Sequence, residues 1–298
     1  MFSEEHPMWI DILRMKEEAV KLHADSVAGS VRLGEIEVGY HDTGAPGDGR
    51  APIVLVHGTG GSTEAHYRTV YPMLAARHRV IGVDAVVDAV SQLSDLVHQV
   101  VAVIEARSPG VPVHLVGYSL GAVVAAALAG RQPVLVKTLT LLAGWITTDK
   151  QQRLRNHVWQ TLFSGERRPL QEFQTLLAFS SQFLRTRADQ DLEALISSRT
   201  FRNGVDREMQ INYNVDIRED VERITAPTLV VGASEDQMVP IRHSYELLGG
   251  IENARLAEVD AGHAVTTERP AQVFMLIDDF VRTPDGVPAG ATVEPLMA

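Results

Sequence analysis

The chain has 298 residues, which corresponds to one large domain or two smaller ones. Because 45% of the residues are hydrophobic and 22% are charged, the composition is that of a soluble globular protein and excludes a wholly disordered chain. The formal net charge of −11 disfavours nucleic acid and membrane surfaces as partners, since both are anionic. The chain has no cysteine, which excludes disulfides, thiolate catalysis and cysteine-based metal sites.

No stretch of the sequence reaches the roughly 20 consecutive apolar residues that a membrane-spanning helix requires. The longest apolar run, at 111–129, is interrupted by polar residues and glycines. Residues 1–6 carry acidic side chains where a signal peptide carries positive charge. We therefore expect a cytoplasmic protein that acts on a small molecule.

Residues 8–23 are predicted to form an amphipathic helix, with apolar side chains near one face and charged side chains near the other. We assign residues 1–29 to this N-terminal helical segment. An apolar helix face of this kind is also compatible with a homodimer. The next segment, 30–42, alternates apolar and polar residues on either side of Gly34-Glu35 and predicts a β-hairpin.

Four short apolar runs then follow, of the kind that suits strands buried on both faces: 53–56, 80–83, 113–116 and 139–142. Helical segments are predicted between them, near 64–77, 89–107 and 120–131. Strand and helix alternate again near the end of the chain, with strands at 228–231 and 254–259 and helices at 241–248 and 270–282. This alternation predicts a parallel sheet with helices on both faces.

The alternation is absent between 145 and 222, where we predict several helices and no strand. This segment holds nearly half of the aromatic residues, an enrichment typical of a ligand pocket. The same side chains could instead form the segment's own small core. The final segment, 283–298, is rich in proline and glycine and predicts a flexible tail.

A sequence with the pattern G-x-S-x-G, Gly117-Tyr118-Ser119-Leu120-Gly121, lies between the predicted strand at 113–116 and the predicted helix that follows. A nucleophilic serine on a tight strand-to-helix turn requires this setting. The two glycines permit the close approach of neighbouring backbone, and the turn exposes the serine hydroxyl above the sheet. The same pentapeptide could also be a small-residue turn without chemistry.

Two further residues follow the last two predicted strands: Asp236 comes after the strand at 228–231, and His263 after the strand at 254–259. The carboxyl ends of parallel strands meet at one edge of a sheet, where ligands bind. Ser119, Asp236 and His263 are therefore expected at the same edge. Other acidic residues near strand ends are alternatives to Asp236, namely Glu235, Asp260 and Asp149.

With these features the chain resembles the α/β-hydrolase family over residues 30–282. Four elements carry the resemblance: His57-Gly58 after a strand, the pentapeptide at 117–121, the loop that contains Asp236, and Gly262-His263. The resemblance implies an α/β fold with a mostly parallel sheet of about eight strands and helices on both faces. It also implies a core formed by 30–144 and 223–282, with 145–222 as a helical cap over the active site.

The resemblance implies that Ser119 is the nucleophile, that His263 takes its proton, and that Asp236 orients the imidazole. It implies an oxyanion hole formed by the backbone N–H groups of Thr59 and Leu120. His57 is interpreted as a structural residue that holds the loop. Because position 119 is serine, the chain differs from the dehalogenases and epoxide hydrolases of this fold, which have aspartate there.

Four aromatic residues are expected to bind substrate: Tyr118, Trp145, Phe179 and Phe183. The loop that follows Asp84 lacks the glycines of many relatives, which we expect to reshape one pocket wall. No cofactor is expected. No metal site is expected either, since no His-x-x-x-His or His-Glu-x-x-His pattern occurs.

These residues together predict a cofactor-independent serine hydrolase that cleaves a small or medium apolar ester, thioester or lactone through an acyl-enzyme on Ser119. Two alternatives use the same fold. The same triad serves enzymes that hydrolyse C–C bonds beside a carbonyl, lyases and perhydrolases. The fold also occurs in non-catalytic ligand receptors, which bind without turnover.

Overall fold

The structure is a computed structural model of the chain that describes residues 21–44, 49–88 and 90–294. Most of the helix predicted at 8–23 lies outside the described residues. Residues 21–23, which are described, are not helical. The chain enters the sheet with β1 (Val27–Leu33), which forms the predicted hairpin with β2 (Ile36–Asp42) through antiparallel pairs.

Nine strands form one sheet in the described part of the chain, in the order β1-β2-β4-β3-β5-β6-β7-β8-β9. Neighbouring strands from β4 to β9 run parallel, whereas β2 is antiparallel to both of its neighbours. The mostly parallel α/β sheet expected from the sequence is confirmed. The strands beyond the hairpin are β3 (Ile53–Val56), β4 (Val80–Asp84), β5 (Val113–Tyr118), β6 (Val136–Leu142), β7 (Thr228–Ala233), β8 (Ala254–Val259) and β9 (Thr292–Val293).

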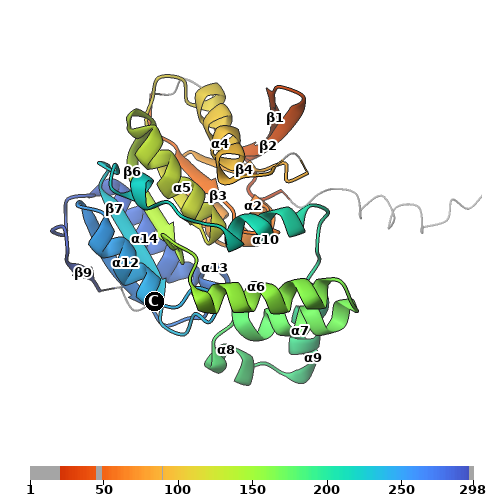
Figure 1. Cartoon of the computed structure of the whole chain (residues 1–298). Helices are drawn as coiled ribbons and strands as arrows, with labels where there is room; N and C mark the ends of the chain where they lie inside the picture. The colour runs from red at the N-terminus through yellow and green to blue at the C-terminus, as the bar shows by residue number, and fades with distance from the viewer. Residues whose placement is uncertain (1–20, 45–48, 89, 295–298) are drawn as a thin grey trace, which may run out of the picture.

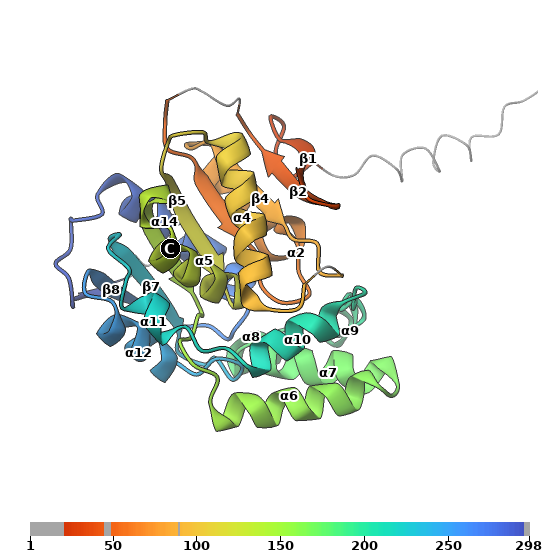
Figure 2. The same cartoon turned by 45° about the horizontal axis from the view of Figure 1, so that its top comes forward.

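Helices cover both faces of the sheet (Figure 1, Figure 2). Successive residues of β3 face opposite sides, since Val54 packs in the cluster with α4 and α5, and Leu55 in the cluster with α3 and α14. Because both faces are covered, the strands are apolar throughout and do not alternate. The core helices are α2 (Thr63–Tyr67), α3 (Val70–Ala75), α4 (Leu93–Arg107), α5 (Leu120–Arg131), the 3-10 helix η1 (Pro133–Leu135), α12 (Arg242–Gly250), α13 (Val265–Glu268) and α14 (Pro270–Arg282).

The insertion between β6 and β7 is paired at its two ends. Thr147 and Asp216 form an antiparallel bridge, and Ile217 N–H donates to Ile146 O at 3.0 Å. Figure 1 shows α6 to α9 grouped on one side of the sheet, with α10 between this group and the core. The helices of the insertion are α6 (Lys150–Phe163), α7 (Arg167–Ala178), α8 (Ser181–Arg185), α9 (Asp189–Ser197), α10 (Val205–Tyr213) and α11 (Arg218–Val221).

The flexible tail predicted at 283–298 contains a strand that the sequence analysis missed. Thr292 and Val293 form β9, which pairs in parallel with Leu256 and Ala257 of β8. Two residues are too few for a recognisable apolar pattern, and the surrounding prolines and glycines favour a loop interpretation.

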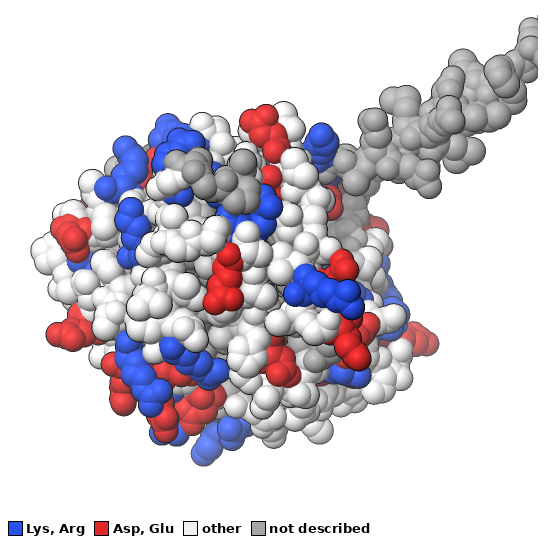
Figure 3. All heavy atoms as spheres, turned by 90° about the horizontal axis from the view of Figure 1, so that it is seen from above, with Lys and Arg blue, Asp and Glu red and all other residues white. Residues whose placement is uncertain are grey.

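No helix in the described ranges combines the length and apolarity needed to cross a membrane. Figure 3 shows the face away from the cap helices, where acidic and basic side chains are scattered among uncharged ones. The described residues on this face therefore form no extended basic surface.

The packing of α11 on α5 leads to a prediction for Gly130 and Gly249, each the next-to-last residue of its helix. A Cβ at Gly130 would lie 2.0 Å from Asp220 O, whereas a Cβ at Gly249 would have no neighbour within 4 Å. We expect Gly130→Ala to lower the free energy of unfolding by about 1–3 kcal/mol. Gly249→Ala should raise it by about 0.5–1 kcal/mol, because alanine favours the helix. Urea denaturation measures both effects, and equal effects would contradict the packing.

Candidate active site

The turn between β5 and α5 holds Ser119 in an unusual backbone conformation, with φ 56° and ψ −122°. A Cβ at Gly121 would lie 2.2 Å from Val56 O, and a Cβ at Gly117 would lie 2.2 Å from Gly121 O. Only glycine fits at these two positions, because a Cβ so close to a backbone oxygen would overlap with it. The sequence-based interpretation of the pentapeptide as a tight strand-to-helix turn therefore agrees with the geometry.

The structure brings Ser119, His263 and Asp236 into one hydrogen-bonded chain. His263 Nε2 lies 2.9 Å from Ser119 Oγ, and His263 Nδ1 lies 2.7 Å from Asp236 Oδ2. The second carboxylate oxygen of Asp236 accepts from the backbone N–H groups of Met238 and Val239, both at 2.8 Å. The side chains of Ser119, His263 and Asp236 are all largely buried. This is the arrangement in which a histidine can take the proton of a serine hydroxyl.

The acidic residues that were alternatives to Asp236 have other partners. Glu235 accepts from Ser181 N–H, and Asp260 hydrogen-bonds to the Ser234 hydroxyl. Asp149 caps the N-terminus of α6. Among the described acidic residues, only Asp236 forms a hydrogen bond with His263.

The loop after β3 places three consecutive backbone N–H groups beside the site. Gly58 N–H donates to His66 Nδ1 at 3.0 Å, and Gly60 N–H donates to Glu208 Oε2 at 2.7 Å. Between them, the Thr59 N–H has no acceptor in the part of the chain that is described. Leu120 is the first residue of α5, so its N–H also lacks an intrahelical acceptor. These two amides are the predicted oxyanion hole, and neither has an acceptor among the described residues. Of the two residues, Thr59 lines the cavity beside Ser119.

Two histidines, the buried His57 and the half-buried His66, support this loop with their neutral side chains. His57 Nδ1–H donates to Gly58 O at 2.8 Å, and His57 Nε2 accepts from Ala85 N–H at 3.2 Å. Burial lowers the pKa of His57, and burial lowers the pKa of His66 well below its usual value. Both ring nitrogens of His57 bind backbone groups, which fits the structural role expected for it.

Helix α10 contributes two residues that hold the same loop and that the sequence analysis did not identify. Glu208 accepts from Gly60 N–H and forms a 3.0 Å ion pair with Arg202. One turn later, Asn212 Nδ2 donates to Thr59 Oγ1 at 2.8 Å. The spacing of four residues places both side chains on one face of α10. No sequence signal distinguishes this acid from the solvent-exposed acids of the insertion.

A second contact joins the insertion to the loop that carries His263. Glu268 is buried and accepts from the backbone N–H and the hydroxyl of Ser180, and also from Gly262 N–H at 3.0 Å. Ser180 lies directly before α8, so the carboxylate connects the insertion to the loop that carries His263. A Cβ at Gly262 would lie 2.5 Å from Ser180 N, which explains why glycine stands before His263.

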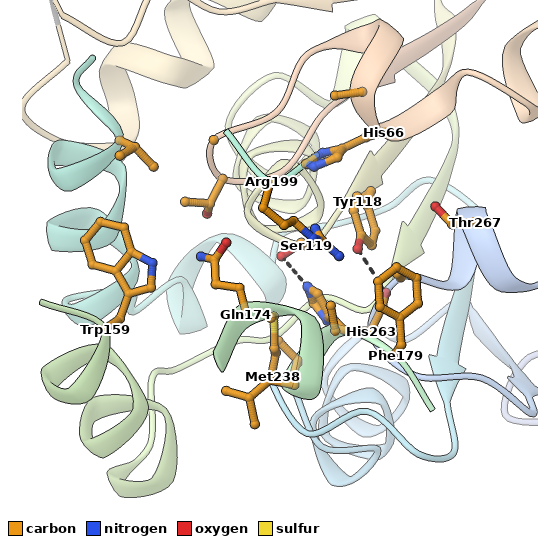
Figure 4. A pocket seen from close by; sticks show the side chains of 18 of the residues that line it. His66, Tyr118, Ser119, Trp159, Gln174, Phe179, Arg199, Met238, His263 and Thr267 are labelled. Carbon is orange, nitrogen blue, oxygen red and sulfur yellow. Dashed lines mark hydrogen bonds between the residues drawn. The ribbon is translucent and has the colours of Figure 1, made fainter. Parts of the chain in front are cut away.

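A cavity of about 370 Å³ lies beside Ser119 and His263, between the core and the insertion (Figure 4). Three of the four residues expected to bind substrate line it: Tyr118, Trp145 and Phe179. Phe183 does not line the cavity, and this expectation was wrong. The Phe183 ring stacks on the Phe179 ring, with centroids 4.7 Å apart and an angle of 9° between the ring planes. Of the two residues, only Phe179 lines the cavity.

Several lining residues were not identified from the sequence. The loop after Asp84, expected to reshape a pocket wall, contributes no described lining residue. Within the residues that the structure describes, no group of three or more His, Asp or Glu side chains could hold a metal ion. The unidentified lining residues with polar or large side chains include His66, Arg155, Trp159, Gln174, Arg199, Asn212 and Met238.

The sheet, the turn and the hydrogen-bonded serine, histidine and aspartate define a protein of the α/β-hydrolase class. The sequence matches the model of the alpha/beta hydrolase fold family over residues 51–270, so the chain belongs to this family.

Several similar proteins of known sequence are named as hydrolases or as a deacetylase. The chain is 30% identical over 267 residues to pyrrolizixenacetamide deacetylase of Xenorhabdus hominickii, covering 86% of this chain and 98% of that protein. It is 26% identical over 275 residues to 2-hydroxy-6-oxo-2,4-heptadienoate hydrolase of Pseudomonas putida, covering 86% and 96%. These similarities support a hydrolase.

Solved structures share the fold. MGS-M2, an alpha/beta hydrolase from a Medee basin deep-sea metagenome library, matches with a TM-score of 0.77 at 21% identity, covering 85% of this chain and 97% of that chain.

The contact between α10 and the loop after β3 leads to a prediction for Glu208. Glu208→Ala removes the acceptor of Gly60 N–H, so the neighbouring Thr59 N–H loses its support. We expect kcat for an ester to fall by about 10- to 100-fold, the scale of a small misplacement of a catalytic group, with little change in KM. Asp206→Ala, an exposed acid on the same helix, is the matched control. Equal kinetics of the two variants would show that Glu208 does not position the loop.

The lowered pKa values of His57 and His66 lead to a prediction for stability in acid. Below about pH 6.5 these two histidines bind more protons in the unfolded chain than in the folded protein, so their contribution to the free energy of unfolding falls as pH decreases. The slope is up to about 1.4 kcal/mol per pH unit for each such histidine. His66→Asn keeps an acceptor for Gly58 N–H. It should reduce the slope of the free energy of unfolding against pH by the contribution of one histidine. Urea denaturation between pH 5 and 7.5 measures it, and an unchanged slope would contradict the lowered pKa.

Proposed function

We propose that the chain is a serine hydrolase that cleaves an ester, thioester or lactone through an acyl-enzyme on Ser119. The observation that carries the proposal is the hydrogen-bonded chain from Ser119 Oγ through His263 to Asp236, beside a cavity of about 370 Å³. A cavity of this size suits a small or medium substrate. The nucleophile, the base and the N–H donors all belong to the chain, so the proposed reaction uses no cofactor.

Acylation is the first half of the proposed reaction. His263 Nε2 accepts the hydroxyl proton of Ser119 as its Oγ attacks the substrate carbonyl. Asp236 accepts the hydrogen bond from His263 Nδ1–H and stabilises the imidazolium without taking the proton. The carbonyl oxygen becomes negative and accepts from the N–H groups of Thr59 and Leu120. The C–O or C–S bond then breaks, the imidazolium returns its proton to the leaving group, and the acyl group stays on Ser119.

Deacylation repeats the same steps with water in place of the serine. His263 takes a proton from a water molecule, whose oxygen attacks the acyl carbonyl while the two amides again bind the negative oxygen. The bond to Ser119 Oγ breaks, and the imidazolium returns the proton to the serine. The products are the free acid and the original enzyme.

The relatives widen the set of bonds that should be tested. One relative is named as the deacetylase of an acetamide, and an amide would require His263 to protonate a poorer leaving group, an amine. Another is named as a 2-hydroxy-6-oxo-2,4-heptadienoate hydrolase, which supports C–C hydrolysis beside a carbonyl as a second candidate function. A panel of p-nitrophenyl esters, N-acetyl amides and β-diketones separates these reactions.

Replacing the nucleophile tests the proposed function. Ser119→Ala should lower kcat for a p-nitrophenyl ester by about a million-fold, the scale found for such triads. A fluorophosphonate should modify the wild-type protein at Ser119, as located by mass spectrometry of peptides, and His263→Ala should abolish the modification. Ser197→Ala is the control, since its hydroxyl bonds to Glu193 away from the cavity and its loss should leave turnover unchanged. Ester turnover that survives Ser119→Ala would sink the proposal.

A further inference from the structure

The charged residues that line the cavity are of one sign. Among the described lining residues, Arg155 and Arg199 carry charge, and there is no aspartate or glutamate. The chain as a whole carries a net charge of −11, so the charge of the cavity lining is opposite in sign to the net charge of the protein. A cavity lined by one sign of charge concentrates ligands of the other sign.

The two arginines differ in how their guanidinium groups are used. Arg155 donates to Met238 O at 2.8 Å and, through two nitrogens, to Asn156 Oδ1. This group therefore has a structural task and is held at the wall. Its hydrogen bonds join α6 to the loop that carries Asp236.

The Arg199 guanidinium makes no hydrogen bond or ion pair with any residue that the structure describes. Its Nε is fully buried, and its central carbon lies 5.1 Å from the centre of the Phe179 ring. Figure 4 shows the side chain reaching into the cavity toward Ser119 and Tyr118. The residue as a whole is half-buried, and partial burial without a carboxylate beside it lowers the pKa of Arg199.

An aromatic face compensates only part of the cost of burying a cation, and the remaining N–H donors, which no described residue accepts from, are available to an acceptor in the cavity. A carboxylate fits a guanidinium with two parallel hydrogen bonds, which is the strongest arrangement available to it. We propose that Arg199 binds a carboxylate of the substrate, so that the substrate is an acyl compound with a free carboxylate in addition to the bond that is cleaved. This inference rests on the proposed function, because it places the substrate in the same cavity as Ser119.

Matched substrates test the proposal. One set consists of mono-p-nitrophenyl esters of dicarboxylic acids with four to six carbons. In the other set the free carboxylate is replaced by a carboxamide of similar size. After subtraction of the enzyme-free rate, wild type should prefer the acids. Arg199→Met should lose about 10- to 150-fold in kcat/KM on the acids, the scale of hydrogen bonds to a charged group, and little on the amides.

Two further variants make the result specific to the guanidinium of Arg199. Arg187→Met is the matched control, because Arg187 is exposed, lies over the Phe183 ring at 4.0 Å and does not line the cavity. It should leave both substrate sets unchanged. Arg199→Lys keeps the charge without the planar fork and should fall between wild type and Arg199→Met on the acids. An equal loss on acids and amides, or no preference of wild type for the acids, would overturn the proposal.

A binding experiment separates this proposal from the proposed function. Ser119→Ala removes the nucleophile, and calorimetry on this variant compares the monomethyl ester of a six-carbon dicarboxylic acid with its carboxamide analogue. Tighter binding of the acid, lost when Arg199→Met is added, supports the carboxylate site even if wild type turns over no ester. Equal binding of acid and carboxamide refutes the carboxylate site even if Ser119 is an active nucleophile.

Discussion

The close approach of backbone segments at the turn between β5 and α5 is the constraint on which the site depends. Gly117 lies against the carbonyl of Gly121, and Gly121 against the carbonyls of Val56 and His57. This proximity lets the chain pass from strand to helix within one residue, Ser119, whose backbone takes a strained conformation. The hydroxyl therefore lies at the carboxyl edge of the sheet, where the loops that follow β3, β7 and β8 also begin. One tight turn thus brings the amides, the acid and the base around a single oxygen.

The insertion is a structural part of this site. Helix α10 supports the loop after β3 through Glu208 and Asn212, and Ser180 before α8 shares the buried carboxylate of Glu268 with the histidine loop. These contacts join residues far apart in the sequence, and each ends on a loop that holds a candidate catalytic group. Changes in the cap are therefore expected to alter the rate of the chemical step and not only the affinity for substrate.

The sequence predicted the sheet, its helices and the meeting of Asp236 with His263, because continuous apolar strands and the parallel arrangement place strand ends at one edge. It did not predict which faces of the cap helices turn inward. Phe183 was assigned to the pocket because it is aromatic, yet it stacks behind its neighbour. Arg199 and Glu208 were not identified from the sequence, since local patterning cannot show which charges of the insertion tertiary packing will bury.

In the proposed reaction the hydrogen-bonded chain activates Ser119 to form an acyl-enzyme. Acid quenching during turnover of a p-nitrophenyl ester, followed by mass spectrometry of the intact protein and its peptides, observes that intermediate directly. We expect a mass increase equal to one acyl group, located on the peptide that contains Ser119 and absent in His263→Ala. Turnover of the ester with no adduct, or with the acyl group on another residue, would contradict it.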